Sequence, residues 1–127
     1  MVPESTSPDT TATLNLTRPT DHRLRTTAEF HRCYDAGFRA GDQHLLLFAT
    51  VSGLDHPRLG VSVSKKHGNA VRRNRRKRLL REAFRLCQHG LPVLDLVVVP
   101  RQTRQPKLHD YQKSLVSLAV RLAKQMA

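Results

Sequence analysis

The chain has 127 residues, 39% of them hydrophobic, which is enough for one compact domain with a modest core. Lys and Arg number 22 against 10 Asp and Glu, so the formal net charge is +12 and a polyanionic partner is favoured, either nucleic acid or an anionic membrane. A membrane is not expected, because the apolar runs are far shorter than the about 20 residues of a spanning helix and no secretory signal is visible. The two cysteines lie far apart in the sequence, which argues against a disulfide framework and favours the cytoplasm.

The first twenty residues differ in composition from the rest of the chain. Residues 1–20 are mostly Thr, Ser, Pro and Asp, and we expect a disordered tail. They hold one of the 22 basic residues and two of the 10 acidic ones, which leaves 21 against 8, or +13, for the rest. The charge therefore belongs to residues 21–127, which we expect to form a single RNA-binding domain.

A helix and two or three strands are predicted in the first half of this domain. Thr26 and Glu29 have the spacing of a capping box at the start of a helix, and Gly37 ends it. Residues 38–51 lack helical periodicity and centre on an apolar strand at 45–48, and residues 59–64 alternate as in a half-buried strand. We expect these two strands to pair as an antiparallel hairpin.

The second half of the domain predicts a helix, a strand and a last helix. Asn69 is a candidate N-cap for a helix that runs to about His89 and stops at Gly90, and residues 94–101 form a strong strand. A loop follows at 102–107. The last helix has an apolar stripe at intervals of three and four: Leu108, Tyr111, Leu115, Leu118, Leu122 and Met126. The predicted order is helix-strand-strand-strand-helix-strand-helix, an α+β fold.

The second helix is strongly basic. Residues 65–84 hold nine Lys or Arg and a single acid, Glu82, which we expect to pair with a neighbouring Arg. On a helical wheel the apolar face consists of Leu79, Leu80, Ala83, Leu86 and Cys87, with Phe84 at its edge. The opposite stripe consists of Asn74, Lys77, Arg78, Arg81 and Arg85. Arg72 and Arg76 fall in line with the apolar face, and we expect them to project past the edge of the core.

This pattern predicts a phosphate-rich ligand. A solvated helix face normally mixes acids and bases, because opposite charges at i,i+4 stabilise a helix. Here like charges recur at that spacing, and the guanidinium fork of Arg matches phosphate oxygens. Backbone N–H groups at the helix start add a second anion site. The candidate RNA-binding residues are Lys65, Lys66, Asn69, Arg72, Arg73, Asn74, Arg75, Arg76, Lys77, Arg78 and Arg81.

Other nucleic-acid-binding classes fit less well. A basic-region leucine zipper needs leucine heptads that continue from the basic helix, but Gly90 and Pro92 end this one. The seven His are scattered without zinc-finger spacing. The aromatic signature of a four-stranded RNA-recognition sheet is absent from the sequence. A ribosomal or general RNA-binding protein fits the charge equally well.

An ordered series of short motifs is similar to one family. The segment Gly60-Val61-Ser62-Val63-Ser64-Lys65-Lys66, followed by Gly68-Asn69-Ala70-Val71 and Arg73-Asn74-Arg75, closely resembles the protein component of bacterial ribonuclease P. The resemblance covers roughly residues 22–124. It implies an α/β sandwich on a four-stranded sheet, with a left-handed crossover from the strand at 59–64 through the basic helix to the strand at 94–100.

The resemblance also implies partners and a binding groove. Such a protein binds the catalytic RNA subunit and the 5′ leader of precursor tRNA, needs no protein partner, and leaves the cleavage to the RNA with its bound magnesium. The leader groove would be formed by Phe30, Tyr34, Leu46 and Phe48. From the residues alone, Phe30 and Tyr34 are more simply core residues.

The rival hypothesis is a self-sufficient nuclease. A two-metal nuclease needs several carboxylates gathered around paired ions. The eight acids beyond residue 20 show no metal-binding motif in the sequence. We therefore expect no catalytic residue and no metal ligand in the protein itself.

Overall fold

The computed structural model describes residues 22–101 and 107–126. The predicted tail and most of the predicted loop at 102–107 lie outside the described residues. The helices and strands are α1 (Thr27–Asp35), β1 (Phe38–Gly41), β2 (Leu45–Val51), β3 (Arg58–Val61), α2 (Ala70–Cys87), β4 (Leu94–Pro100) and α3 (Leu108–Met126), with short 3-10 turns at Lys65–His67 and Gln88–Gly90. Their order is the predicted one.

The four strands form one mixed sheet in the order β1-β2-β4-β3. β2 pairs antiparallel with both β1 and β4, and β4 pairs parallel with β3. The predicted hairpin between residues 45–48 and 59–64 is therefore wrong. β4 separates the two strands, because it is buried almost throughout and fits only the centre of the sheet. The hairpin joins β1 to β2 instead, through a turn in which Asp42 accepts the N–H groups of His44 and Leu45.

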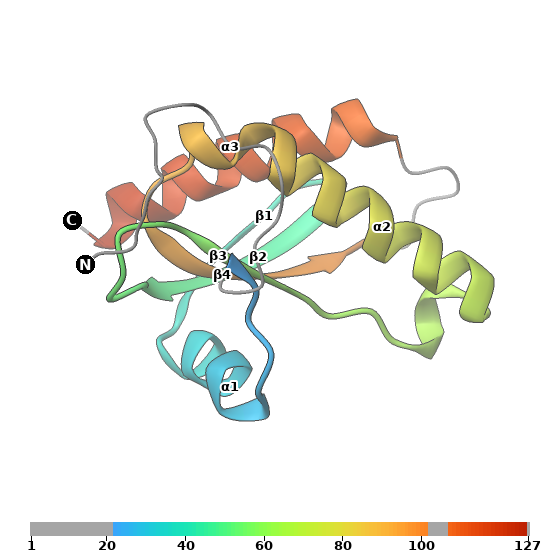
Figure 1. Cartoon of the computed structure of the whole chain (residues 1–127), viewed down its shortest axis with the longest axis horizontal. Coiled ribbons are helices and arrows are strands. Elements are labelled where there is room, and N and C mark those ends of the chain that lie inside the picture. Colours follow the sequence, from blue (N-terminus) through green and yellow to red (C-terminus); the bar gives the residue numbers. More distant parts are fainter. Residues whose placement is uncertain (1–21, 102–106, 127) are drawn as a thin grey trace, which may run out of the picture.

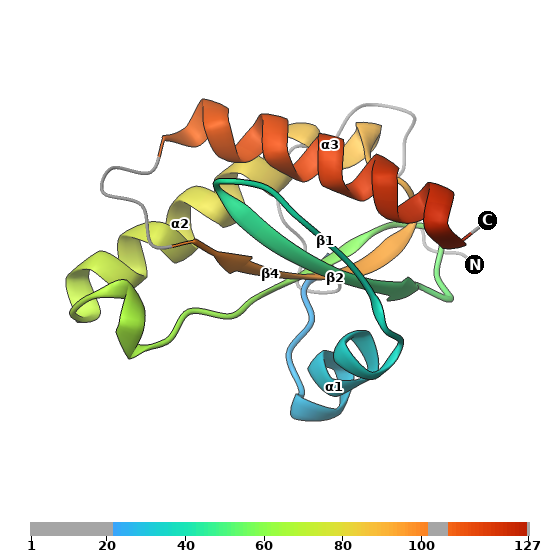
Figure 2. The same ribbon diagram turned by 180° about the vertical axis from the view of Figure 1, so that it is seen from behind.

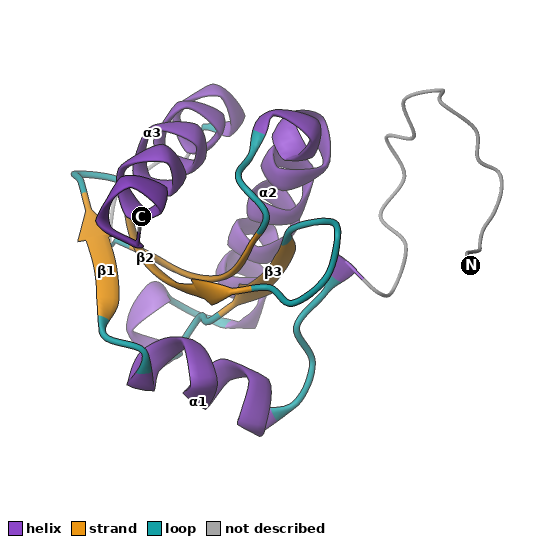
Figure 3. Cartoon of the chain, turned by 90° about the vertical axis from the view of Figure 1, so that its left-hand side faces the viewer, coloured by secondary structure: helices purple, strands orange, loops and turns teal. Residues whose placement is uncertain are grey.

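The connection from β3 through α2 to β4 has the uncommon hand. β3 and β4 run in the same direction, and α2 returns over the face of the sheet that also carries α3 (Figures 1 and 3). With that face towards the viewer and the strands pointing upwards, β4 lies to the left of β3, so the crossover is left-handed. General rules predict a right-handed crossover in about 98% of cases, whereas the family resemblance predicted the observed hand.

Helices cover the sheet unequally on its two faces. α2 and α3 lie side by side over one face, and the short α1 lies alone on the other (Figures 1 and 2). The side chains of β2 alternate between these two faces. Leu45 and Leu47 are buried beneath α2 and α3, whereas Phe48 points towards α1. The predicted stripe of α3 packs into the larger core, with Tyr111, Leu115, Leu118 and Leu122 fully buried.

The buried face of α2 is rotated relative to the predicted one. Leu80, Ala83 and Phe84 are buried as core residues, but Leu86 is 37% exposed. Phe84 therefore belongs to the centre of the apolar face and Leu86 to its rim. Cys33 is buried and Cys87 half-buried, both as free thiols, and burial raises the pKa of each to about 11. Both remain protonated at neutral pH, as expected for structural cysteines.

Candidate nucleic-acid interface

Local hydrogen bonds set the start of the basic helix. The Asn69 side chain accepts the N–H of Arg72 at 2.9 Å, which confirms Asn69 as the N-cap of α2. Immediately before it, Ser64 caps the 3-10 turn that carries Lys65 and Lys66. Gly68 joins the two with φ of +106°, a backbone conformation that favours glycine. The motif therefore builds a fixed corner with two lysines on one side and α2 on the other.

The cationic residues of this corner and helix are mostly open to solvent. Seven of the eleven predicted residues are exposed: Lys65, Lys66, Asn69, Arg72, Asn74, Arg75 and Arg78. Arg73, Lys77 and Arg81 are partly exposed, at i,i+4 intervals along one side. The Nε of Arg73 is buried and has no hydrogen-bond partner among the described residues. Ten of the eleven side chains are thus available to a ligand on this surface, which we call the basic surface.

Arg76 differs from the other predicted residues. It is only 8% exposed, and its guanidinium donates to the Arg101 carbonyl at 3.3 Å and to the Tyr111 hydroxyl at 3.4 Å. The expectation that Arg76 projects past the core edge is therefore wrong. Its position in line with the apolar face directs the side chain into the contact between α2 and α3, where it holds these helices and the end of β4 together.

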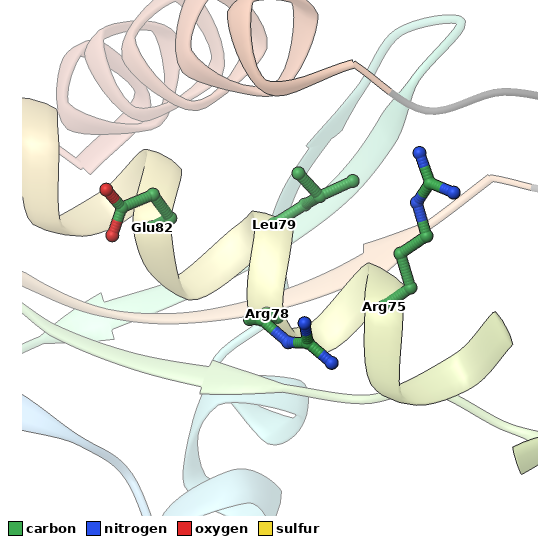
Figure 4. Close-up of a pocket in the computed structure, with 4 residues that line it drawn as sticks. All are labelled: Arg75, Arg78, Leu79 and Glu82. Atoms are coloured by element: carbon green, nitrogen blue, oxygen red, sulfur yellow. The ribbon is translucent and has the colours of Figure 1, made fainter. Parts of the chain in front are cut away.

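Glu82, the acid of the basic segment, is paired. It accepts two hydrogen bonds from Arg85, with Nε–Oε1 at 2.8 Å, which confirms the expected pairing. In the middle of α2, a hollow is lined by Arg75, Arg78, Leu79 and Glu82 (Figure 4). It therefore combines two guanidinium groups with one carboxylate and one apolar side chain.

A second surface forms on the other face of the sheet, around α1. Phe30 and Tyr34 of α1 and Phe48 of β2 are half-buried and pack on Leu24, Cys33 and Val97. The Tyr34 and Phe48 rings meet edge to face with centroids 4.9 Å apart. Leu46 points to this face by strand alternation and is also half-buried. The structure thus brings the four residues to one face of the sheet, and we call this set the aromatic groove, after the leader groove that the sequence analysis predicts for them.

A glycine makes room for one of these rings. A Cβ atom on Gly60 of β3 would lie 2.6 Å from Cζ of Phe30, which is closer than such contacts occur. Phe30 therefore lies directly on the backbone of β3. Glycine at position 60 therefore has a steric reason, since a side chain there would displace the Phe30 ring.

Two basic residues beside the groove are missing from the sequence-based set. Arg39 of β1 is the register partner of Phe48 and is exposed on the same face. Arg101 follows β4, and its guanidinium lies over Gly41, next to Leu46. Strand alternation would have placed Arg39 on this face, but only if the pairing of β1 with β2 had been known.

Ionic contacts attach α1 to the sheet below the groove. The Asp95 carboxylate of β4 is fully buried and accepts from Arg58 of β3 and Arg32 of α1. Arg58 also donates to Glu29, whose pKa is lowered to about 2, mainly by the N–H groups of Arg25 and Thr26 and further by Arg58. Both halves of the predicted capping box are present. We call Glu29, Arg32, Arg58 and Asp95 the ionic network; an Asp within the apolar run of β4 was the sequence signal for it.

Within the described ranges, no three His, Cys, Asp or Glu side chains gather as they would to hold a metal ion. The same ranges contain no helix long and apolar enough to cross a membrane. What the described residues do present is one arginine-rich surface and one aromatic groove flanked by arginines.

Together these surfaces define an α+β nucleic-acid-binding protein, and comparison with known proteins identifies its family. The family model for ribonuclease P matches residues 19–123. The ribonuclease P protein component of Haemophilus influenzae strain PittGG is 45% identical over 89 residues, which are 69% of this chain and 73% of that one. The solved ribonuclease P proteins of Staphylococcus aureus and Thermotoga maritima superpose with TM-scores of 0.69 and 0.70, at 34% and 30% identity. The matched region covers 81% of this chain and 95% of the Staphylococcus aureus protein, and 78% of this chain and 96% of the Thermotoga maritima protein.

This chain belongs to the ribonuclease P protein family. Its members are protein components of a ribonucleoprotein nuclease that acts in tRNA 5′ processing. The resemblance seen in the ordered motifs is therefore confirmed.

Proposed function

We propose that this chain is the protein subunit of ribonuclease P and that its two surfaces bind two different RNAs. The basic surface binds the catalytic RNA subunit, and the aromatic groove binds the 5′ leader of precursor tRNA. The observation that carries this division is that α2, which bears most of the basic surface, and α1, which bears Phe30 and Tyr34, lie on opposite faces of the sheet (Figure 3). One protein can then contact both RNAs at once.

The basic surface suits a folded RNA backbone. Ten cationic or amide side chains lie exposed or partly exposed along α2 and the turn before it. Phosphate contacts of this kind release counterions, so the affinity should depend strongly on salt. Arg73 is a candidate for a direct contact, because its side chain is partly exposed and lies on the same side of α2 as Lys77 and Arg81.

The aromatic groove suits an unpaired strand of variable sequence. Bases stack on aromatic rings with about 1–3 kcal/mol per base and with little sequence preference. Phe48 and Tyr34 are half-buried, so part of each ring is accessible for such a contact. Arg39 and Arg101 lie beside the apolar floor, where they can neutralise the phosphates of the same strand.

Magnesium is proposed to be held mainly by the RNA subunit. Among the described residues, Glu29, Asp95 and Glu82 are paired with arginines, Asp42 accepts backbone N–H groups, and no three His, Cys, Asp or Glu side chains gather as a metal site requires. We therefore propose that the protein supplies no catalytic residue. It contributes by positioning the leader and by reducing repulsion between two polyanions, and the hydrolysis belongs to the RNA.

The reaction is proposed to take place in the cytoplasm, with no second protein required. The test is an assay of precursor tRNA with protein alone, RNA alone and both together. We expect specific 5′ cleavage to require the RNA and the protein to strengthen it. Cleavage by RNA-free protein that disappears when Asp or Glu residues are replaced would favour the self-sufficient nuclease and overturn the proposal.

A further inference from the structure

Apolar burial alone does not hold α1 in place. Of its nine residues, all of them described, Cys33 is the buried one, whereas Phe30 and Tyr34 remain half-buried. A helix that forms one wall of a binding groove must nevertheless keep a fixed orientation. The remaining contacts of α1 with the sheet are therefore decisive for the shape of the groove.

Arg58 makes the most extensive of these contacts. Its Nε and Nη2 donate to the two carboxylate oxygens of Asp95, at 2.9 and 2.7 Å, and its Nη1 donates to Glu29 Oε2 at 2.9 Å. One guanidinium thus uses all three of its nitrogen atoms, two towards β4 and one towards α1. Its side chain is 15% exposed and its donors point inwards, so it is poorly placed to bind RNA.

The α1 end of this contact is rigid as well. Glu29 accepts the N–H groups of Arg25 and Thr26 with Oε1, at 2.8 and 3.0 Å, which leaves Oε2 for Arg58. Phe30 is the next residue in the chain, and its ring lies against Gly60, two residues after Arg58. Arg58 and Gly60, both on β3, therefore contact adjacent residues in the same turn of α1.

We propose that Arg58 is a positioning residue of the leader groove, which holds α1 so that the rings of Phe30 and Tyr34 face the leader. The inference rests on the proposed function of the groove. Arg32 is a weaker anchor, because its side chain is 51% exposed. Lys at position 58 would keep the charge but could not form the bidentate contact and reach Glu29 as well.

The test uses the reconstituted holoenzyme with the full chain. For Arg58→Lys we expect the affinity for precursor tRNA to fall by about fivefold or more, roughly 1 kcal/mol. The affinities for mature tRNA and for the RNA subunit should change less than about twofold, because the groove and the basic surface are separate. Arg121→Lys on the exposed side of α3 is the matched control and should change none of the three.

A double-mutant cycle with Phe30→Ala identifies the route of the effect. If Arg58 acts through the α1 wall, Arg58→Lys should cause little further loss of precursor affinity once Phe30 is Ala. Additive losses would mean that Arg58 acts elsewhere and would overturn the inference. If Phe30→Ala and Phe48→Ala both leave precursor affinity unchanged, the groove function itself fails, which is a different result.

A second variant covers the case in which Arg58→Lys does not fold. Glu29→Gln keeps an oxygen for the helix cap but removes the ionic contact with Arg58. It should show a smaller loss in the same direction, confined to precursor tRNA. Equal losses for precursor and mature tRNA in a folded variant, or no loss for either, would contradict the positioning role.

Discussion

The basic surface and the aromatic groove are built in different ways. The basic surface comes from one continuous segment, residues 64–81, in which each cap and turn is made by near neighbours. The groove combines α1 and β2, with β3 and β4 beneath them. Its wall depends on ionic contacts between residues up to 63 positions apart, the separation of Arg32 and Asp95. Substitutions of the exposed Lys and Arg side chains in the first surface should therefore affect binding alone, whereas those near the second should also affect stability.

The largest expected effect tests the groove's dependence on tertiary contacts. Asp95→Ala leaves Arg58 and Arg32 without their shared buried partner, and breaking such a group costs about 3–5 kcal/mol. Denaturant unfolding should show this loss, while Asp35→Asn on the exposed part of α1 should change little. A loss below about 1 kcal/mol would mean that the ionic network does not support the fold.

The next effect concerns the ligand of the groove. Phe48→Ala removes a half-buried ring next to Tyr34 and should weaken precursor tRNA binding by about 1–3 kcal/mol, with mature tRNA nearly unaffected. Comparative binding to the holoenzyme measures the difference. Unfolding must be followed in parallel, because loss of a packed ring also reduces stability.

The basic surface predicts effects on binding without effects on folding. Arg73→Ala, Lys77→Ala or Arg81→Ala should each weaken binding to the RNA subunit and lower the salt slope by about one or less. The free energy of unfolding should stay within about 0.5 kcal/mol. Arg76→Ala is the informative contrast, because its buried guanidinium contacts Tyr111 and its loss should reduce stability. Retention of the full salt slope in the first three variants would exclude them as phosphate contacts.

A smaller effect follows from the lowered pKa of Glu29. A carboxylate with a depressed folded-state pKa stabilises the protein above its unfolded value near 4.5, and this contribution is lost as the pH falls towards about 2. Because the group is close to solvent, about 1 kcal/mol is expected. The unfolding free energy should fall more between pH 5.5 and 3 in the natural chain than in Glu29→Gln. If the unfolding free energy depends on pH equally in both proteins, Glu29 does not contribute to the acid sensitivity of the fold.

The smallest effect is expected for the tail. Residues 1–20 carry one basic residue and two acidic ones. Their deletion should change the affinity for RNA by much less than tenfold, about 1.4 kcal/mol, as measured by binding to the RNA subunit. A larger loss would show that the two surfaces do not account for all of the binding.

The two surfaces also differ in how well the sequence predicts them. The N-cap at Asn69, the capping box of α1, the pairing of Glu82 and the stripe of α3 all depend on near neighbours, and all were predicted. Strand pairing is not local, so the hairpin was assigned to β2 and β3 instead of β1 and β2. Arg76 and Leu86 were misplaced because the rotation of α2 depends on its contact with α3. The four groove residues came from the family resemblance, and the ionic network was not foreseen.

The measurement that tests the central claim most directly compares Arg73→Ala and Phe48→Ala in one experiment. Each variant is titrated against the RNA subunit, and its holoenzyme is then titrated with precursor and mature tRNA at fixed salt. Two separate surfaces predict a crossed result, in which Arg73→Ala lowers affinity for the RNA subunit alone and Phe48→Ala lowers the precursor-to-mature ratio alone. If both folded variants weaken both kinds of binding to a similar extent, the division into two RNA surfaces is contradicted.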